Sequence, residues 1–112
     1  SLPVEELESL FQRTRDGGAE VVRYLKTGSA FYAPASGVVE MAGAILRNTQ
    51  ATLPVCAALD GEYGLRDVCI GVPAQLGASG IERIVELPLA PQEQQALAAA
   101  AAQVRAGIAS LP

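Results

Sequence analysis

The stretch ATLPVCAALDGEYGLRDVCIGV, residues 51–72, decides the fold because it predicts a β-hairpin. Its two arms, 51–59 and 66–72, flank the turn-rich segment DGEYG at 60–64. Symmetric pairing about Glu62-Tyr63 keeps one face apolar, as the register of a half-buried sheet requires. The expected pairs are Val55 with Ile70, Cys56 with Cys69, and Ala57 with Val68. Pro54 restricts the first arm to a strand beginning or a sheet edge.

The next segments extend the hairpin into a meander. The glycine turn LGASG at 76–80 leads into IERIVELPL at 81–89. The spacing of that last run fits a short helix nearly as well as a strand. Its shortness, its β-branched residues and the bounding Gly80 and Pro88 favour a strand. We therefore expect three antiparallel strands.

A helix follows the meander, and another long helical stretch precedes it. Pro91 opens the last helix, which carries a narrow apolar stripe at Leu97, Ala101, Val104 and Ile108. Residues 4–26 show helical spacing of apolar residues, with Gly17-Gly18 in the middle. Two glycines there cost about 1 kcal/mol each relative to alanine, so we expect a kink, a break or close backbone packing. The charged side chains of this stretch indicate a solvated or interface face.

The joint after that stretch is the bend LKTGSAFYAPAS, residues 25–36. Gly28 fits a helix stop, and Pro34 fits the first position of the next helix. This leaves residues 29–33 irregular and the hydroxyl of Ser29 available. Phe31 is expected in the core, where two helices meet. From Pro34 to Leu46 nearly every residue is apolar or small, which predicts a helix buried on all sides.

Composition limits the classes of partner. The chain has 112 residues, half of them apolar, which suits one domain with a modest core. Its net charge is −4 and it has no run of Lys or Arg, which argues against nucleic acid or an anionic membrane as a partner. No leader and no apolar stretch near the ~20 residues of a membrane helix is present, so we expect a cytoplasmic protein. The fold class is α+β, with long helices packed on a small antiparallel β-meander.

The residue types and motifs that the chain lacks exclude several classes of catalytic and metal site. The chain has no histidine, so it has no Ser/His or Cys/His pair and no HExxH zinc site. It also has no glycine-rich phosphate loop. Cys56 and Cys69 are the only cysteines and form no CxxC, which argues against a metal site. The hairpin makes a bridge between them conceivable, but two buried reduced thiols are favoured. No catalytic residue is expected in this chain.

Two long strings carry a family resemblance. RTRDGGAEVVRYLKTGSAFYAPASGVVEMAGAIL (13–46) and LPVCAALDGEYGLRDVCIGVPAQLGASGIERIVELPL (53–89) resemble the C-terminal part of NAD-dependent malate dehydrogenases. The likeness is to the lactate-dehydrogenase-like bacterial group and spans residues 5–109. KTGSAFYAPA and GEYGLRDVCIGVPAQLGASGIERI are its most specific motifs.

The resemblance implies a substrate-binding domain that packs against a nicotinamide-binding Rossmann domain. Ser29 then matches a small hydroxyl residue beside the pocket for a small 2-hydroxy or 2-oxo dicarboxylic acid. Ala33 and Pro34 match positions close to the nicotinamide ring of NAD. The resemblance also implies a homo-oligomer, dimeric or tetrameric, and a role in the tricarboxylic acid cycle.

The sequence departs from the family in what it lacks. The catalytic histidine, its partner aspartate, the substrate-binding arginines and the nucleotide loop all precede the matched region. We therefore expect a single, incomplete substrate-binding domain over residues 1–112, without its Rossmann domain and inactive alone. Two alternatives stay open: part of a lactate dehydrogenase, or a non-catalytic self-associating scaffold.

Overall fold

The structure is a computed structural model that describes residues 2–112. The chain divides into two compact units, the first ending at Val39 and the second spanning Glu40–Pro112. Within the described residues, no helix combines the length and the apolar character needed to cross a lipid bilayer.

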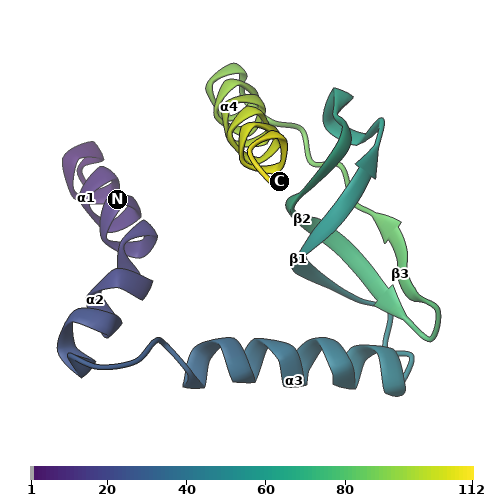
Figure 1. The fold of residues 1–112 in the computed structure, drawn as a ribbon, viewed down its shortest axis with the longest axis horizontal. Coiled ribbons are helices and arrows are strands. Elements are labelled where there is room, and N and C mark those ends of the chain that lie inside the picture. The colour runs from purple at the N-terminus through teal and green to yellow at the C-terminus, as the bar shows by residue number, and fades with distance from the viewer. Residues whose placement is uncertain (1) are drawn as a thin grey trace. The chain divides into compact units, whose positions relative to one another are not determined.

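The first unit is helical. Helix α1 spans Val4–Arg15 and α2 spans Gly17–Leu25. Of the three alternatives expected here, a kink, a break or close backbone packing, the structure shows a break at Asp16, directly before the glycine pair. Helix α3, Tyr32–Leu46, begins in this unit and ends in the second (Figure 1). The prediction of separate helices before and after the bend is confirmed, although α3 begins at Tyr32, within residues 25–36.

The second unit contains the predicted three-stranded antiparallel sheet (Figure 1). Strand β1 spans Ala51–Asp60, β2 spans Arg66–Gly77 and β3 spans Gly80–Ile84, in the order β1-β2-β3. A 3₁₀ turn, η1 at Glu62–Gly64, joins the first two strands. Because β1 is an edge strand, Pro54 removes no ladder hydrogen bond from a central strand.

The hairpin register differs from the expected one by two residues. Val55 pairs with Val72, Cys56 with Gly71 and Ala57 with Ile70. A shift of two residues returns every side chain to the same face, so the apolar pattern tolerates both registers. The predicted pairing of Cys56 with Cys69 is therefore wrong, although the predicted apolar face, which includes Val55, Ala57, Val68 and Ile70, is right.

One face of the sheet forms the core. The buried residues of β1 and β2 alternate. Buried residues from the C-terminal turn of α3 and from the last helix, α4 (Pro91–Ala109), complete the cluster. Its members are Ala44, Val55, Ala57, Leu59, Leu65, Val68, Ile70, Val72, Ala74, Leu76 and Ala101. Leu76 is the largest side chain that is fully buried. The alternation of period two explains why the opposite face of the ribbon is exposed.

Helix α4, Pro91–Ala109, begins at the proline that the sequence indicated and lies beside the sheet (Figure 1). The Ala90 backbone N–H donates to the Glu93 carboxylate at 2.8 Å, which satisfies one of the donors at the helix N-terminus. Leu97 and Val104 pack against the core around Ala101. Ile108, expected on the same stripe, is 54% exposed because that stripe reaches past the core contacts.

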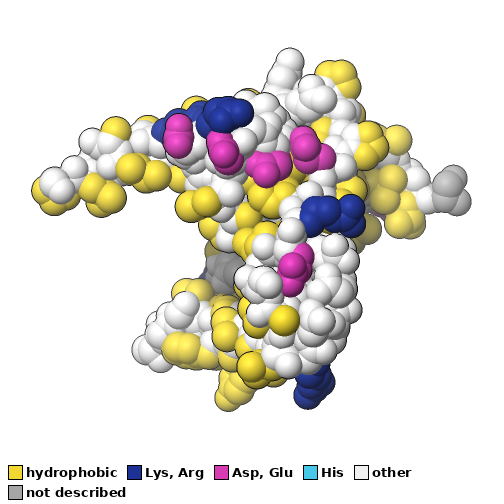
Figure 2. Space-filling view, turned by 90° about the vertical axis from the view of Figure 1, so that its right-hand side faces the viewer, with side chains coloured by type: hydrophobic (Ala, Val, Ile, Leu, Met, Phe, Trp, Pro, Cys, Tyr) yellow, Lys and Arg dark blue, Asp and Glu magenta, His cyan; other side chains and the backbone are white. Residues whose placement is uncertain are grey.

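Two burial predictions are wrong. Cys56 and Cys69 are free and exposed, because both lie on the sheet face opposite the core. Helix α3 is buried only at Ala44, and Val38 and Val39 are 65% and 71% exposed. A helix that is apolar all round needs cover on every side, and the described residues supply it only near the C-terminal end. Figure 2 shows many hydrophobic side chains at the surface.

Candidate functional site

The bend between α2 and α3 is shaped by two left-handed residues. Lys26 has φ 64° and Gly28 has φ 88°, so the chain leaves the path of α2 directly after Leu25. Two features require glycine at position 28. One is the positive φ, and the other is that a Cβ atom there would lie 3.1 Å from the ring of Phe31. A residue without a side chain accepts both the positive φ and the aromatic ring.

The three residues that the resemblance singled out lie close together along this bend. Ser29 is exposed and lies outside both helices, as predicted. Ala33 and Pro34 are exposed in the first turn of α3. The helix begins at Tyr32, so the prediction that Pro34 occupies its first position is wrong by two residues. The first four N–H groups of a helix have no intrahelical acceptor, so proline at the third position loses no hydrogen bond.

The aromatic residues of the bend are not core residues. Phe31 is 61% exposed and Tyr32 is 90% exposed, so the expectation that Phe31 is buried is wrong. Phe31 instead lies against Gly28 within the bend. Exposed aromatic surface next to the exposed Ser29 hydroxyl suits a ligand or another protein surface better than bulk water.

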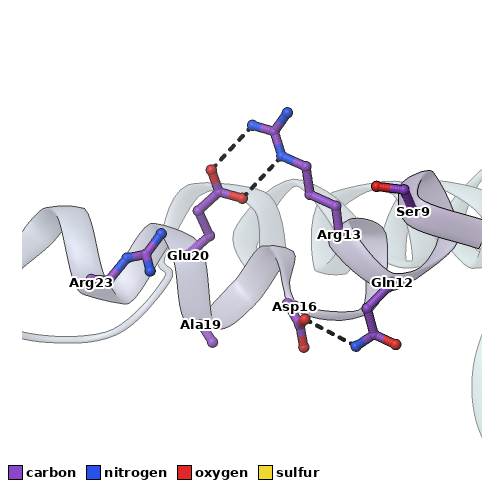
Figure 3. A pocket seen from close by; sticks show the side chains of 7 residues that line it. All are labelled: Ser9, Gln12, Arg13, Asp16, Ala19, Glu20 and Arg23. Carbon is purple, nitrogen blue, oxygen red and sulfur yellow. Dashed lines mark hydrogen bonds and ion pairs between the residues drawn. The ribbon is translucent and has the colours of Figure 1, made fainter. Parts of the chain in front are cut away.

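A groove of about 670 Å³ lies at the α1–α2 break (Figure 3). The guanidinium of Arg13 on α1 donates two hydrogen bonds, of 3.3 and 3.1 Å, to the carboxylate of Glu20 on α2. The amide of Gln12 donates to the Asp16 carboxylate at 3.0 Å. The groove is lined by Ser9, Gln12, Arg13, Asp16, Ala19, Glu20 and Arg23.

The ion pair shifts both titrating groups. The hydrogen bonds from Arg13, together with its charge, lower the pKa of Glu20 below its usual 4.5, and Arg23 adds a smaller effect. Glu20 in turn raises the pKa of Arg13. The charges lining the groove are thus largely matched within it, and the arrangement bridges the helix break rather than holding a reactive group.

Sequence reasoning missed this bridge for a physical reason. Side chains seven positions apart are two turns apart on a continuous helix, beyond the neighbour spacing of three or four. The break at Asp16 changes the path of the chain, so Arg13 and Glu20 meet across it. The signal available in the sequence was the combination of Gly17-Gly18 with opposite charges on either side.

The second unit has its own pocket, of about 590 Å³, beneath the hairpin tip. Tyr63 closes one side, and the connection from β3 to α4 closes the other. Apolar side chains make up most of the lining, namely Leu65, Leu87, Pro88, Leu89, Leu97 and Ala98. Its polar groups are already engaged, since the Glu86 carboxylate accepts a 2.8 Å hydrogen bond from the Tyr63 N–H.

Neither region assembles a metal centre of the usual kind. Among residues 2–112, no group of three or more His, Cys, Asp or Glu side chains is positioned to hold an ion. The exposed residues of the bend, Ser29, Ala33 and Pro34, stay candidates from the family resemblance.

Residues 1–111 match the model of the family described as lactate/malate dehydrogenase, alpha/beta C-terminal domain. The chain is similar to a malate dehydrogenase from Desulforudis audaxviator, 52% identical over 104 residues, which cover 93% of this chain and 34% of the relative. A malate dehydrogenase from Xanthobacter autotrophicus is 58% identical over 90 residues, covering 80% of this chain and 28% of the relative. The chain thus spans about a third of the length of the curated relatives it matches.

Comparison with solved structures gives the same fold. The malate dehydrogenase from Aeropyrum pernix aligns with a TM-score of 0.92 at 38% identity, covering 99% of this chain and 37% of that one. The lactate dehydrogenase from Cryptosporidium parvum aligns with a TM-score of 0.94 at 35% identity, with the same coverage of each chain.

Proposed function

Because the chain belongs to the lactate/malate dehydrogenase family, as its α/β C-terminal domain, we propose that it serves as the substrate-binding part of an NAD-dependent malate dehydrogenase. This proposal rests mainly on the relatives of up to 58% identity that are named malate dehydrogenases. The activity of the whole enzyme interconverts malate and oxaloacetate.

The exposed bend is the proposed contact with the reactants. The Ser29 hydroxyl can donate to a carboxylate or carbonyl oxygen of the substrate, because it lies outside both helices and is exposed. The side chains of Ala33 and Pro34, in the first turn of α3, are small enough for a flat nicotinamide ring to approach the backbone. These roles rest on the family resemblance and fit the exposure of the three residues.

The chemistry divides between this chain and the rest of the enzyme. Bound NAD would accept the hydride that leaves C2 of malate. The hydroxyl proton must pass to a base, and this chain has no histidine to receive it. We therefore propose that the chain orients the substrate, and that a preceding Rossmann domain supplies the base and most of the cofactor site. On this proposal, residues 1–112 are one incomplete substrate-binding domain and are inactive alone.

The proposed cellular location, pathway and oligomeric state follow from the same family assignment. We propose a cytoplasmic enzyme of the tricarboxylic acid cycle that acts as a homo-oligomer, a dimer or a tetramer. The substrate is a small dicarboxylic acid, and the acidic net charge of −4 offers no attraction to nucleic acid or an anionic membrane.

Lactate dehydrogenase is the second candidate because the Cryptosporidium parvum enzyme shares this fold at 35% identity. The sequence relatives favour malate, at 49–58% identity. The two candidates differ in whether the substrate carries a second carboxylate.

A domain graft tests the proposal. The chain would replace the matched third of the Desulforudis audaxviator malate dehydrogenase, and a second graft would replace the matched part of the Cryptosporidium parvum lactate dehydrogenase. We expect the first graft to oxidise malate with NAD and the second to lose most of its activity on lactate. The 112-residue chain alone serves as the blank. A first graft that folds and assembles but has no malate activity would overturn the proposal. The opposite pattern of activity would favour the lactate enzyme.

A further inference from the structure

The two cysteines lie on the same exposed face of the β1–β2 ribbon. Cys56 pairs with Gly71, and Cys69 pairs with Ala58 two residues further along β1. Paired residues share a face, and so do residues two apart on a strand, so both thiols project from the side opposite the core. Both are free and exposed.

The residues opposite the cysteines leave room between the thiols. A Cβ atom added at Gly71 would meet nothing within 4 Å, so the space beside Cys56 is open. Ala58 presents only a methyl group beside Cys69. Nothing bulky on the paired positions separates the two sulfur atoms.

Cys56 and Cys69 are diagonal neighbours across the two strands, and this determines the distance that a bridge between them must span. Diagonal residues of an antiparallel pair are about 7–8 Å apart, with their Cβ atoms somewhat closer. Residues whose Cα atoms are more than about 7 Å apart cannot form a disulfide without backbone movement. A ligand atom placed between the two sulfurs lengthens the bridge and removes that need. The geometry thus favours a sulfur–ligand–sulfur link over a direct sulfur–sulfur bond.

We propose that Cys56 and Cys69 form a two-thiolate site for a soft thiophilic metal ion, with Cu(I) as its ligand. Soft thiolate ligands select Cu(I), which accepts two sulfur ligands. Structural zinc needs four ligands, and the described residues offer no group of three or more donors. On binding, two Cu–S bonds form, two S–H bonds break and two protons are released; copper stays in the +1 state and no electron is transferred.

The test is a copper competition on the 112-residue chain. The probe is Cu(I) held by the coloured chelator bicinchoninate under anaerobic, reducing conditions. We expect the chain to withdraw one Cu(I) per chain, which native mass spectrometry would detect as one copper for each chain in whatever oligomer forms. Cys56→Ser and Cys69→Ser should each weaken binding by on the order of a hundredfold, since the second thiolate acts at high effective concentration.

A matched control separates a paired site from two independent thiols. The double variant Cys69→Ser with Thr52→Cys keeps two exposed thiols on one face of β1. They are four residues apart, or roughly 13 Å at about 3.3 Å per residue, too far for one ion to bridge. Binding as weak as that of the single serine variants supports the proposal. Binding equal to wild type, or one copper shared between two chains, would overturn it. Unchanged circular dichroism checks folding, which surface serines should not disturb.

Discussion

The Tyr63 hydroxyl donates a 2.9 Å hydrogen bond to the carbonyl oxygen of Val85, twenty-two residues away in the chain. The Tyr63 hydroxyl oxygen also accepts a 3.0 Å hydrogen bond from the Leu87 N–H. One side chain thereby ties the hairpin tip to the connection that leads from β3 into α4. Tyr63 reaches this place with φ 54°, a left-handed conformation that is uncommon for an aromatic residue.

Removing that hydroxyl should destabilise the second unit. We expect Tyr63→Phe to lower the free energy of unfolding by about 1–2 kcal/mol, because it leaves the partly buried Val85 carbonyl and the exposed Leu87 N–H without this partner. Urea unfolding followed by circular dichroism measures the change. Tyr32→Phe, at a side chain that is 90% exposed, is the matched control and should change little. Equal effects of the two variants would show that the Tyr63 bonds add nothing to stability.

The β2–β3 turn gives a second stability prediction, at Gly77. A Cβ atom there would collide with the side-chain ends of Asn48, Gln50 and Glu82. The Asn48 oxygen accepts from the Ala78 N–H at 2.9 Å, and the Glu82 oxygen accepts from the Ser79 N–H at 3.0 Å. Gly77→Ala should therefore cost about 1–2 kcal/mol, roughly the value of the bonds displaced.

Gly71→Ala is the control for that variant, since its added methyl group meets open space on the exposed face. We expect its stability to be unchanged or to rise by less than about 1 kcal/mol. If Gly77→Ala unfolded at the same urea concentration as Gly71→Ala, the polar contacts of the turn would not matter to the fold.

The hairpin shows how far periodicity carries a prediction. Alternating apolar residues determine which face of β1 and β2 is buried, and that part is confirmed at Val55, Ala57 and Val68. Periodicity of two does not choose between registers two residues apart. The observed choice depends on η1 and on the irregularity after Leu59, which in turn involve the positive φ of Tyr63. An aromatic residue gives no sequence signal for that conformation.

The bend and the helix after it show a different limit of prediction from sequence. The helix stop before the left-handed Gly28 and the exposure of Ser29 follow from residue types and are confirmed, whereas α3 begins two residues earlier than predicted. Burial of α3 does not follow from the chain alone, because an apolar helix indicates that it is covered without indicating by what. The Arg13–Glu20 pair was also missed, since its formation depends on the angle at a helix break.

Acid should weaken the α1–α2 bridge. The folded state lowers the pKa of Glu20 below 4.5, so the carboxylate contributes stability above that pH and loses it as the pH falls through the lowered value. We expect the helical signal of wild type to fall more steeply below pH 4.5 than that of Glu20→Gln, which lacks the pair at every pH. Glu8→Gln, at an exposed position of α1, is the control and should follow wild type. High salt should reduce the difference, because the pair is exposed. Parallel acid profiles for Glu20→Gln and wild type would contradict the assignment.

Ser29 should matter to turnover in the active graft described above. We expect Ser29→Ala to lower kcat/KM for malate by about tenfold, near the value of one hydrogen bond to a charged group. Thr27→Ala removes a hydroxyl from the same connection and should leave kcat/KM unchanged. Ala33→Phe should instead raise the KM for NAD, because a large side chain would fill the space proposed for the nicotinamide ring. If both Ser29→Ala and Ala33→Phe matched the parent graft, the bend would be ruled out as a contact with the reactants.

The exposed apolar surface of α3 should make the isolated chain self-associate. Val38 and Val39 lie on a helix turn with little cover, and burying such surface contributes about 25 cal/mol per Å². Sedimentation velocity should show a concentration-dependent rise in mass. Replacing both valines with glutamate should shift the chain toward monomer. The control places the same two charges on α4, at the exposed Gln95 and Gln103, and should associate like wild type. If both double variants became monomeric, net charge rather than the α3 surface would govern association. A wild-type chain that stayed monomeric at high concentration would contradict the prediction outright.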